Sequence, residues 1–226
     1  MTELEAIRAR HSVRQYLNRP LTPEELTALR AEADACNRES GLHIQLVVNE
    51  PKAFEGSMAR YGKFSGVQNY FALVGKAGPD LQEKCGYWGE RLVLKAQAMG
   101  LNTCWVALTF TKVKSAYTLD EGEKLAAVIS LGHGATQGVP HKSKKPEDIA
   151  AYEGEAPEWF RKGTEALLLA PTALNRQAFS LRGEGRRVAM TCAGGAFSGV
   201  ELGIGRYHFE LGAGKENFDW ISPDIE

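Results

Sequence analysis

The residues with the clearest chemical potential form the segment Arg10-His11-Ser12-Val13-Arg14 near the N-terminus. This segment follows a short stretch with helical spacing and itself has an extended pattern, so Arg10, Ser12 and Arg14 are expected to project to one face. Two guanidinium groups around a hydroxyl suit a phosphate, which accepts charge-assisted bidentate hydrogen bonds. A solvated surface would use the same residues, so both interpretations stay open at this point.

A second polar cluster lies far along the chain, in Ala170-Pro171-Thr172-Ala173-Leu174-Asn175-Arg176-Gln177. It follows a segment with an apolar helical face. Loop amides and the side chains of Thr172, Asn175 and Gln177 could recognise the donors and acceptors of a flat heterocycle. The alternative is a capped turn, in which the Asn and Thr side chains bond to their own backbone.

Lysines near these segments are further candidates. Lys144 and Lys145 belong to the basic stretch 142–146, which could supply a second anchor for a phosphate. Lys63 precedes an apolar run and could reach an anionic ring oxygen. The alternative is that all three are ordinary surface lysines, whose stems lie along the protein while the charge stays in water.

Other catalytic patterns are missing from the sequence. His133, His141 and His208 lack the spacing of zinc ligands. There is no Gly-x-Ser-x-Gly motif, and the glycines of 183–185 and 194–214 match neither a Walker loop nor a dinucleotide fingerprint. The sequence therefore gives little support to a hydrolase, a P-loop protein or a Rossmann enzyme.

The composition predicts a folded protein with a packed core. The chain has 226 residues, 43% of them hydrophobic and 24% charged, and its net charge is -1. These values exclude a disordered chain and lack the basic excess of a nucleic-acid binder. No apolar run approaches the roughly 20 residues that span a bilayer, and the acidic start has no signal-peptide pattern. Four scattered cysteines without a CxxC pair predict a reduced, cytoplasmic protein.

Helices and strands can be placed around the candidate residues. Thr22, Pro23 and Glu25 have the pattern of a capping box and predict a helix that reaches about Asn37. The longest predicted helix is 80–99, ended by Gly100. Patterns of apolar and β-branched residues predict strands at 43–48, 70–75, 101–108, 125–133 and near 179–181.

The chain is predicted to have two units. Residues 136–155 are rich in Gly, Lys, Pro, Glu and Asp, as expected for a linker between residues 1–135 and a shorter unit at 156–226. The pattern partly repeats after the linker, because a Pro-Glu pair opens a helix in each unit and residues 203–209 echo residues 100–106. We therefore predict an internal duplication, in which one chain carries both halves of a site that other proteins build between subunits.

Together, three segments resemble the nitroreductase family. Residues 6–16 are similar to its opening Arg-Arg-Ser-x-Arg-x-Phe signature, and residues 92–105 resemble its long central helix with the Gly-Leu-x-x-x-Trp exit. Residues 170–177 resemble its Ala-Pro-Ser-x-x-Asn-x-Gln loop. In the family this loop follows the arginine signature by a few dozen residues, but here that position, 35–41, has lost the Pro-Ser core. The resemblance therefore implies a single chain that mimics the family dimer, as a monomer with one FMN site.

The resemblance implies cofactor-binding residues in both units. Those of the arginine signature would hold the phosphate and ribityl chain, with His11 in place of the usual second arginine. Lys63 would lie near the pyrimidine edge, Trp105 and Val106 near the reactive nitrogen, and the 171–177 loop along the ring. The predicted set is Arg10, His11, Ser12, Arg14, Lys63, Trp105, Val106, Lys144, Lys145, Pro171, Thr172, Ala173, Asn175 and Gln177.

The implied fold is α+β, with a central, mostly antiparallel sheet wrapped by helices. The implied function is an FMN-dependent oxidoreductase that takes electrons from NADH or NADPH and reduces nitroaromatic, quinone or related small acceptors. The flavin would perform the redox step, so no catalytic side chain and no metal are expected. A flavin-binding or sequestering protein without fast turnover is the alternative, given His11 and the altered 36–41 segment. A small acyl or regulatory domain unrelated to flavin is a third.

Overall fold

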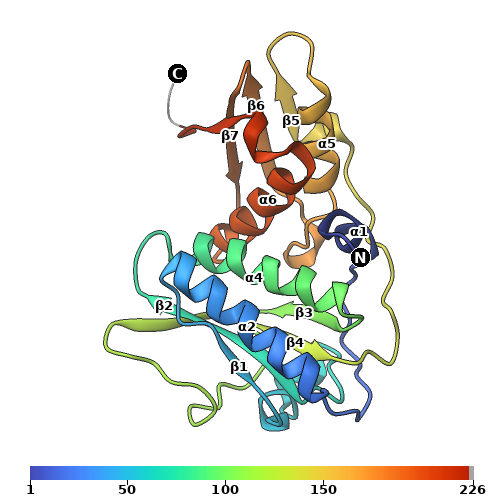
Figure 1. Ribbon diagram of the computed structural model, residues 1–226, viewed down its shortest axis with the longest axis vertical. Helices are drawn as coiled ribbons and strands as arrows, with labels where there is room; N and C mark the ends of the chain where they lie inside the picture. The colour runs from blue at the N-terminus through green and yellow to red at the C-terminus, as the bar shows by residue number, and fades with distance from the viewer. Residues whose placement is uncertain (224–226) are drawn as a thin grey trace.

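Two four-stranded sheets organise the chain, and the helices α4 (Leu81–Ala98) and α6 (Ser198–Ala213) meet between them (Figure 1). The computed structural model describes residues 1–223. The N-terminal helix α1 (Glu3–Ala9) lies beside this helix pair and contacts both of its members. The α+β class with an antiparallel sheet and helices is confirmed, and a second, mixed sheet adds to it.

The first sheet is antiparallel throughout and has the order β1 (Gln45–Val47), β2 (Asn69–Lys76), β4 (Glu123–Gly132), β3 (Asn102–Val106). Its strands lie within a few residues of the predicted ones. Helix α2 (Pro23–Ser40) and helix α4 cover one face of the sheet, where they share a hydrophobic core with β2 and β4. The short helix α3 (Ser57–Tyr61) and the loops around it cover the opposite face.

Local signals define the ends of α2. The Thr22 hydroxyl accepts a hydrogen bond from the Glu25 amide at 3.2 Å, and the Glu25 carboxylate accepts one from the Thr22 amide at 2.8 Å. This capping box satisfies amide groups that have no partner inside the helix. Gly41 ends the helix with φ 72°, a left-handed conformation that glycine adopts without a steric penalty. The predicted start is confirmed, and the helix continues three residues past the predicted end at Asn37 because Gly41 is the first stop.

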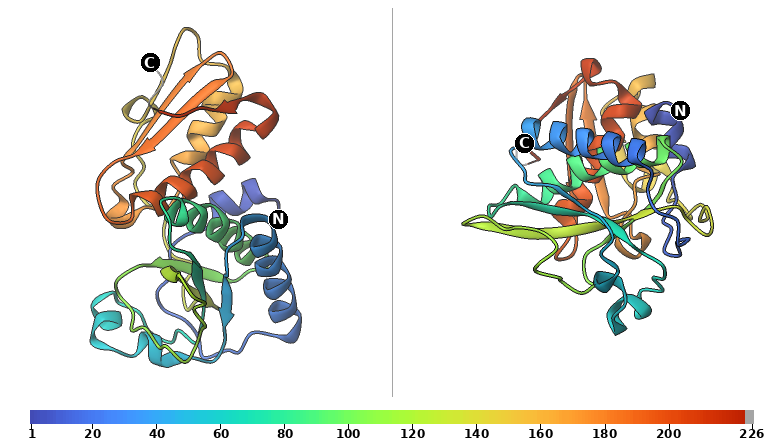
Figure 2. Two further views of the ribbon diagram at one scale, coloured as in Figure 1. Left: turned by 90° about the vertical axis from the view of Figure 1, so that its left-hand side faces the viewer. Right: turned by 60° about the horizontal axis from the view of Figure 1, so that its bottom comes forward.

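The second sheet has the order β5 (Ala150–Tyr152), β6 (Phe179–Glu184), β7 (Arg187–Cys192), β8 (Asp219–Trp220). Strands β6 and β7 form an antiparallel hairpin, and the short outer strands pair in parallel with them. Helices α5 (Glu158–Leu167) and α6 pack on this sheet, as the left view of Figure 2 shows. Strand β5 lies inside the predicted linker 136–155, so the end of that segment is part of the second sheet.

Helices α4 and α6 cross at a contact that requires glycine on both sides. A Cβ atom on Gly86 would lie 2.0 Å from the carbonyl oxygen of Val200, and one on Gly203 would lie 2.0 Å from that of Glu83. Both distances are far below van der Waals contact, so neither position accepts a side chain. The crossing joins the two halves directly through their helix backbones.

The predicted echo between residues 100–106 and 203–209 is wrong in detail, because residues 203–209 lie within α6 and are not a helix exit followed by a strand. If α3 is left out, the order α2-β1-β2-α4-β3 in the first half is similar to α5-β6-β7-α6-β8 in the second, with β4 and β5 between the two series. Internal duplication stays a prediction. Among the described residues, no helix combines the length and apolar character that crossing a membrane requires.

Candidate functional site

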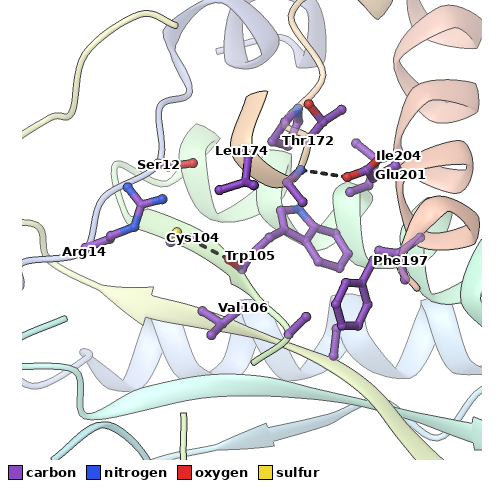
Figure 3. A pocket seen from close by; sticks show the side chains of 15 residues that line it. Ser12, Arg14, Cys104, Trp105, Val106, Thr172, Leu174, Phe197, Glu201 and Ile204 are labelled. Carbon is purple, nitrogen blue, oxygen red and sulfur yellow. Dashed lines mark hydrogen bonds between the residues drawn. The ribbon is translucent and has the colours of Figure 1, made fainter. Parts of the chain in front are cut away.

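A cavity opens between the two halves of the chain, at the end of β3 (Figure 3). The first half contributes the segment after α1, the last residues of β3 and a position on β4. The second half contributes the loop after α5 and the first turns of α6. The lining residues are Ser12, Arg14, Cys104, Trp105, Val106, Ala107, Ala127, Pro171, Thr172, Ala173, Leu174, Phe197, Val200, Glu201 and Ile204.

The predicted N-terminal signature reaches the cavity by extending the first sheet. Ser12 forms a parallel bridge with Thr103 of β3, and the Val13 amide donates to the Thr103 carbonyl at 3.0 Å. This pairing places Ser12 and Arg14 along the cavity wall. The exposed Arg14 guanidinium lies 6.0 Å from the ring centre of Phe64 and has no hydrogen bond or ion pair within residues 1–223. It is therefore a cation available to a ligand.

Trp105 is the largest side chain in the cavity wall, and helix α4 fixes its position. Its indole Nε1 donates to the Glu90 carboxylate at 2.7 Å, and Glu90 is completely buried. The ring passes so close to α4 that a Cβ on Gly89 would lie 2.5 Å from its Cη2 atom. A buried hydrogen bond and a helix position without a side chain thus fix the indole together.

A buried hydrogen bond between Glu90 and His208 stabilises the Trp105 side of the cavity. The other Glu90 oxygen faces Nε2 of the buried His208 at 2.9 Å, and Nδ1 of His208 lies 3.0 Å from the Ala166 carbonyl oxygen. Because a carbonyl only accepts, Nδ1 carries a hydrogen, and one further proton sits between Nε2 and Glu90. This network ties Trp105 on β3 to α4, α5 and α6.

The opposite wall is the loop 171–174, whose conformation is fixed from several sides. The Ala173 amide donates to the Glu201 carboxylate at 2.8 Å, and the Thr172 hydroxyl accepts from the Gln177 amide at 3.0 Å. Leu174 and Asn175 both have positive φ angles, 54° and 53°. Leu174 is 93% exposed although it lines the cavity mouth.

Helix α6 supplies four lining residues that the sequence analysis missed: Phe197 at its N-cap, then Val200, Glu201 and Ile204. Their spacing places them on one helix face, which could have identified them. The sequence interpretation compared the glycines of 194–214 only with phosphate-binding motifs, which they do not match, and did not predict a helix there. Glu201 is 2% exposed, and its second oxygen lies 3.4 Å from the Cys192 thiol.

Of the fourteen predicted site residues, the structure brings seven together in the cavity wall: Ser12, Arg14, Trp105, Val106, Pro171, Thr172 and Ala173. Arg10 does not reach the wall. It caps α1 and lies 3% exposed in the interior, with its Nε 3.8 Å from Glu90 and without a hydrogen bond. His11 is half-buried, and burial together with the nearby Arg10 and His141 lowers its pKa.

Two predicted residues, Asn175 and Gln177, stabilise the 171–174 loop through hydrogen bonds outside the cavity lining. Gln177 is 1% exposed, and its side chain donates to the Leu168 carbonyl and accepts from the Lys144 amide. Asn175 donates to the Lys142 carbonyl at 2.8 Å. Both side chains therefore join the 171–177 loop to the preceding segment and do not face the cavity lining.

The three predicted lysines also lie outside the lining. The Lys144 ammonium donates to the Gln177 carbonyl at 3.0 Å, while that of Lys145 is exposed 3.9 Å from Glu147. Lys63 is exposed in the turn after α3, next to the buried Phe64 that underlies Arg14. Their predicted positions against a ligand are thus not part of the cavity wall in the described structure.

The cavity contains no activated nucleophile among its lining residues. Cys104 is its only cysteine, and burial raises the pKa of that thiol, which keeps it protonated and unreactive. The remaining wall is largely apolar, with Trp105 and Phe197 as aromatic surfaces. Such a cavity suits a flat ligand that carries its own chemistry.

The family model described as "Putative TM nitroreductase" matches residues 3–213. The chain belongs to this family. Among solved structures, one similar chain is "a putative nitroreductase" from Thermotoga maritima, with 23% identity over 96% of this chain and 85% of that chain and a TM-score of 0.67. No match was found among curated protein sequences.

Two further solved structures share the fold at lower coverage. A "Putative NADH dehydrogenase/NAD(P)H nitroreductase" from Parabacteroides distasonis is 22% identical, covering 65% of this chain and 95% of that chain, with a TM-score of 0.52. A "putative nitroreductase" from Desulfovibrio desulfuricans, solved in complex with FMN, is 18% identical, covering 70% of this chain and 99% of that chain, with a TM-score of 0.51. At these identities the similarity establishes the fold of this nitroreductase-family chain. Its ligand must be argued from its own residues.

Proposed function

We propose that this protein is an FMN-dependent oxidoreductase that takes electrons from NADH or NADPH and reduces nitroaromatic, quinone or related small acceptors. The observation that carries the proposal is the cavity at the end of β3, where Ser12 and Arg14 of the first half face the 171–174 loop of the second. Membership in a nitroreductase family and the FMN bound by one structural neighbour support it.

The donor set of this chain fits FMN. Arg10 is buried without any hydrogen-bond acceptor within residues 1–223, and Arg14 is a free cation at the cavity wall. The only carboxylate that pairs with Arg10 among residues 1–223 is Glu90, at 3.8 Å and without a hydrogen bond, and a phosphate matches the donor geometry of a guanidinium. The aromatic and aliphatic wall built by Trp105, Val106 and Ile204 suits a flat ring system. The phosphate end and the ring end of FMN thus each meet residues of matching chemistry.

The residues proposed to bind FMN act in three groups. Arg10, His11, Ser12 and Arg14 hold the phosphate and ribityl chain, and Trp105 with Val106 forms the wall under the ring. Pro171, Thr172 and Ala173 form the opposite wall. Five predicted residues would support the site from outside the cavity lining: Lys63, Lys144, Lys145, Asn175 and Gln177.

When bound, FMN supplies the hydride chemistry, and the protein binds, orients and shields it. Glu90 fixes the Trp105 indole, and Glu201 fixes the loop opposite. The neutral Cys104 thiol adds no competing nucleophile. A nicotinamide and an acceptor would each reach the ring in turn past the exposed Leu174.

The division of the wall between the two halves favours a monomer with one flavin per chain, in which the second half takes the place of a partner subunit. A cytoplasmic location is proposed on the same basis as before, because all four cysteines are free thiols. Light scattering combined with flavin quantitation tests the first point. Two FMN per chain, or activity found only in a dimer, would contradict it.

The decisive experiment is the absorption spectrum of the purified protein before and after addition of NADH or NADPH without oxygen. The proposal expects a yellow protein whose flavin absorbance disappears within seconds. A yellow protein that does not bleach would support the flavin-binding alternative. A protein that stays colourless even after FMN is added would refute flavin binding altogether.

A further inference from the structure

We propose that His141 is a phosphate-binding residue of the cofactor site, an inference that rests on the proposed function. His141 belongs to residues 138–145, which we call the strap. The sequence analysis considered its lysines as phosphate ligands and set the histidine aside. The structure favours the reverse assignment.

The strap runs between the two segments that carry the candidate cofactor residues. On one side it is bonded to the loop after α5: the Ser143 hydroxyl donates to the Leu168 carbonyl at 3.0 Å, and the Lys144 amide donates to the Gln177 side chain at 2.7 Å. On the other side, a Cβ built on Gly138 would lie 2.7 Å from the Cβ of His11. The strap therefore contacts the arginine signature and the loop together.

One nitrogen of the His141 ring is bonded, and the other is not. Nε2 lies 3.5 Å from the Leu169 carbonyl oxygen, which only accepts, so Nε2 carries the hydrogen. Nδ1 is buried and has no hydrogen-bond partner in the described residues. A buried polar atom without a partner is unfavourable and indicates a missing ligand.

Arg10 is a second buried polar group without a hydrogen bond in this region. Arg10 is 3% exposed, and its Nε also has no hydrogen bond. Burial and then the nearby Arg10 and His141 lower the pKa of His11, so all three side chains lie in one region. The nearest carboxylate to Arg10 is Glu90 at 3.8 Å, already bonded to Trp105 and His208. Glu90 is thus shared among three partners, and it leaves the Nε of Arg10 without a hydrogen bond.

The lysines of the strap are less suited to the role. The Lys144 ammonium donates to the Gln177 carbonyl, and Lys145 points to solvent near Glu147. Only His141 combines an open nitrogen with burial. A neutral imidazole presents a lone pair at Nδ1, so one proton must lie between Nδ1 and a phosphate oxygen. Either the imidazole or the monoester supplies it, since the second ionisation of a phosphate monoester is near pH 6.

The test compares FMN with riboflavin, which has the same ring and ribityl chain but no phosphate. Dissociation constants are measured by fluorescence titration of the apoprotein for wild type, His141→Ala and a control, His43→Ala. His43 pairs with Glu123 at the start of β4, and neither residue lines the cavity. We expect His141→Ala to weaken FMN about tenfold or more, the effect of one charge-assisted hydrogen bond, and to leave riboflavin unchanged.

Other outcomes overturn the inference in distinguishable ways. Equal weakening of FMN and riboflavin by His141→Ala would show a structural effect on the strap and not a phosphate contact. Unchanged FMN affinity would refute the contact while leaving the proposed function intact. A wild-type protein that binds neither flavin would refute the proposed function and this inference together. His141→Arg, which restores a cation, should recover part of the FMN affinity if charge is the reason.

Discussion

Replacing Glu201 tests whether the loop opposite Trp105 is a wall of the functional site. The buried Glu201 carboxylate accepts a hydrogen bond from the Ala173 amide at 2.8 Å and lies 3.4 Å from the Cys192 thiol. Glu201→Leu removes the acceptor and leaves the Ala173 amide unpaired, whereas Glu201→Gln keeps an oxygen in place. A hydrogen bond to a charged group contributes about 1.5–3 kcal/mol. We therefore expect Glu201→Leu to lower the free energy of unfolding by roughly 2 kcal/mol and Glu201→Gln by less than about 1 kcal/mol.

The two variants should also differ in cofactor binding. If residues 171–174 contact the flavin, release of the loop in Glu201→Leu should raise the FMN dissociation constant by about tenfold, and Glu201→Gln should stay close to wild type. Urea unfolding and FMN titration measure the two quantities on the same protein. A Glu201→Leu protein that loses stability but binds FMN normally would refute the contact between residues 171–174 and the flavin. Equal stability of both variants would refute the importance of the Ala173 hydrogen bond.

Three further changes test the rest of the site. The double variant Arg10→Ala, Arg14→Ala should lose FMN during gel filtration while melting cooperatively, because each charge-assisted bond contributes about 1.5–3 kcal/mol; full flavin retention would contradict the phosphate assignment. Gly89→Ala introduces a methyl group 2.5 Å from the Trp105 ring, so tryptophan fluorescence should change and FMN affinity should fall; normal affinity would argue against Trp105 as a wall. The lowered pKa of His11 disfavours its protonated form in the folded state. Stability of the flavin-free protein should therefore fall as pH drops from about 6.5, the unfolded value, through the folded pKa. The melting temperature of His11→Gln should depend less on pH than that of wild type. Identical pH profiles of the two proteins would contradict this explanation.

The sequence predicts most of the first half, because the signals there are local. The capping box at Thr22 and Glu25 defines the start of α2 within its first turn, and Gly41 ends it where a positive φ is needed. The strands of the first sheet are runs of buried apolar residues, so their position depends little on distant partners. These elements could be placed from the residues alone.

The second half is less predictable because long-range packing decides it. Helix α6 has glycines at positions such as Gly203 and Gly205, which weaken helix propensity and favour a loop interpretation. They are explained only by the close approach of α4 to Gly203 and of the Phe179 and Leu167 side chains to Gly205. Strands β5 and β8 have three and two residues, too short for a periodic pattern, and exist through pairing with β6 and β7.

The site shows the same division. Seven predicted residues meet in the cavity because they lie at element ends that the family-like motifs mark. The roles of Arg10, Asn175 and Gln177 depend on partners that no motif encodes, such as Glu90 and the Lys142 carbonyl. Motif spacing alone cannot distinguish a residue that contacts a ligand from one that holds the contacting segment.

The helix crossing explains why residues so distant in sequence line one cavity. Gly203 allows α6 to touch the backbone of α4, and the neighbouring Val200 and Ile204 then reach the cavity at the end of β3. On the α4 side, Glu90 holds Trp105 of the same cavity and shares a proton with His208 of α6. Buried helix contacts therefore set the distance between the walls, and the 171–174 loop completes the lining of the cavity. Both walls of the described cavity therefore come from one chain, which is the observation behind the proposed monomer.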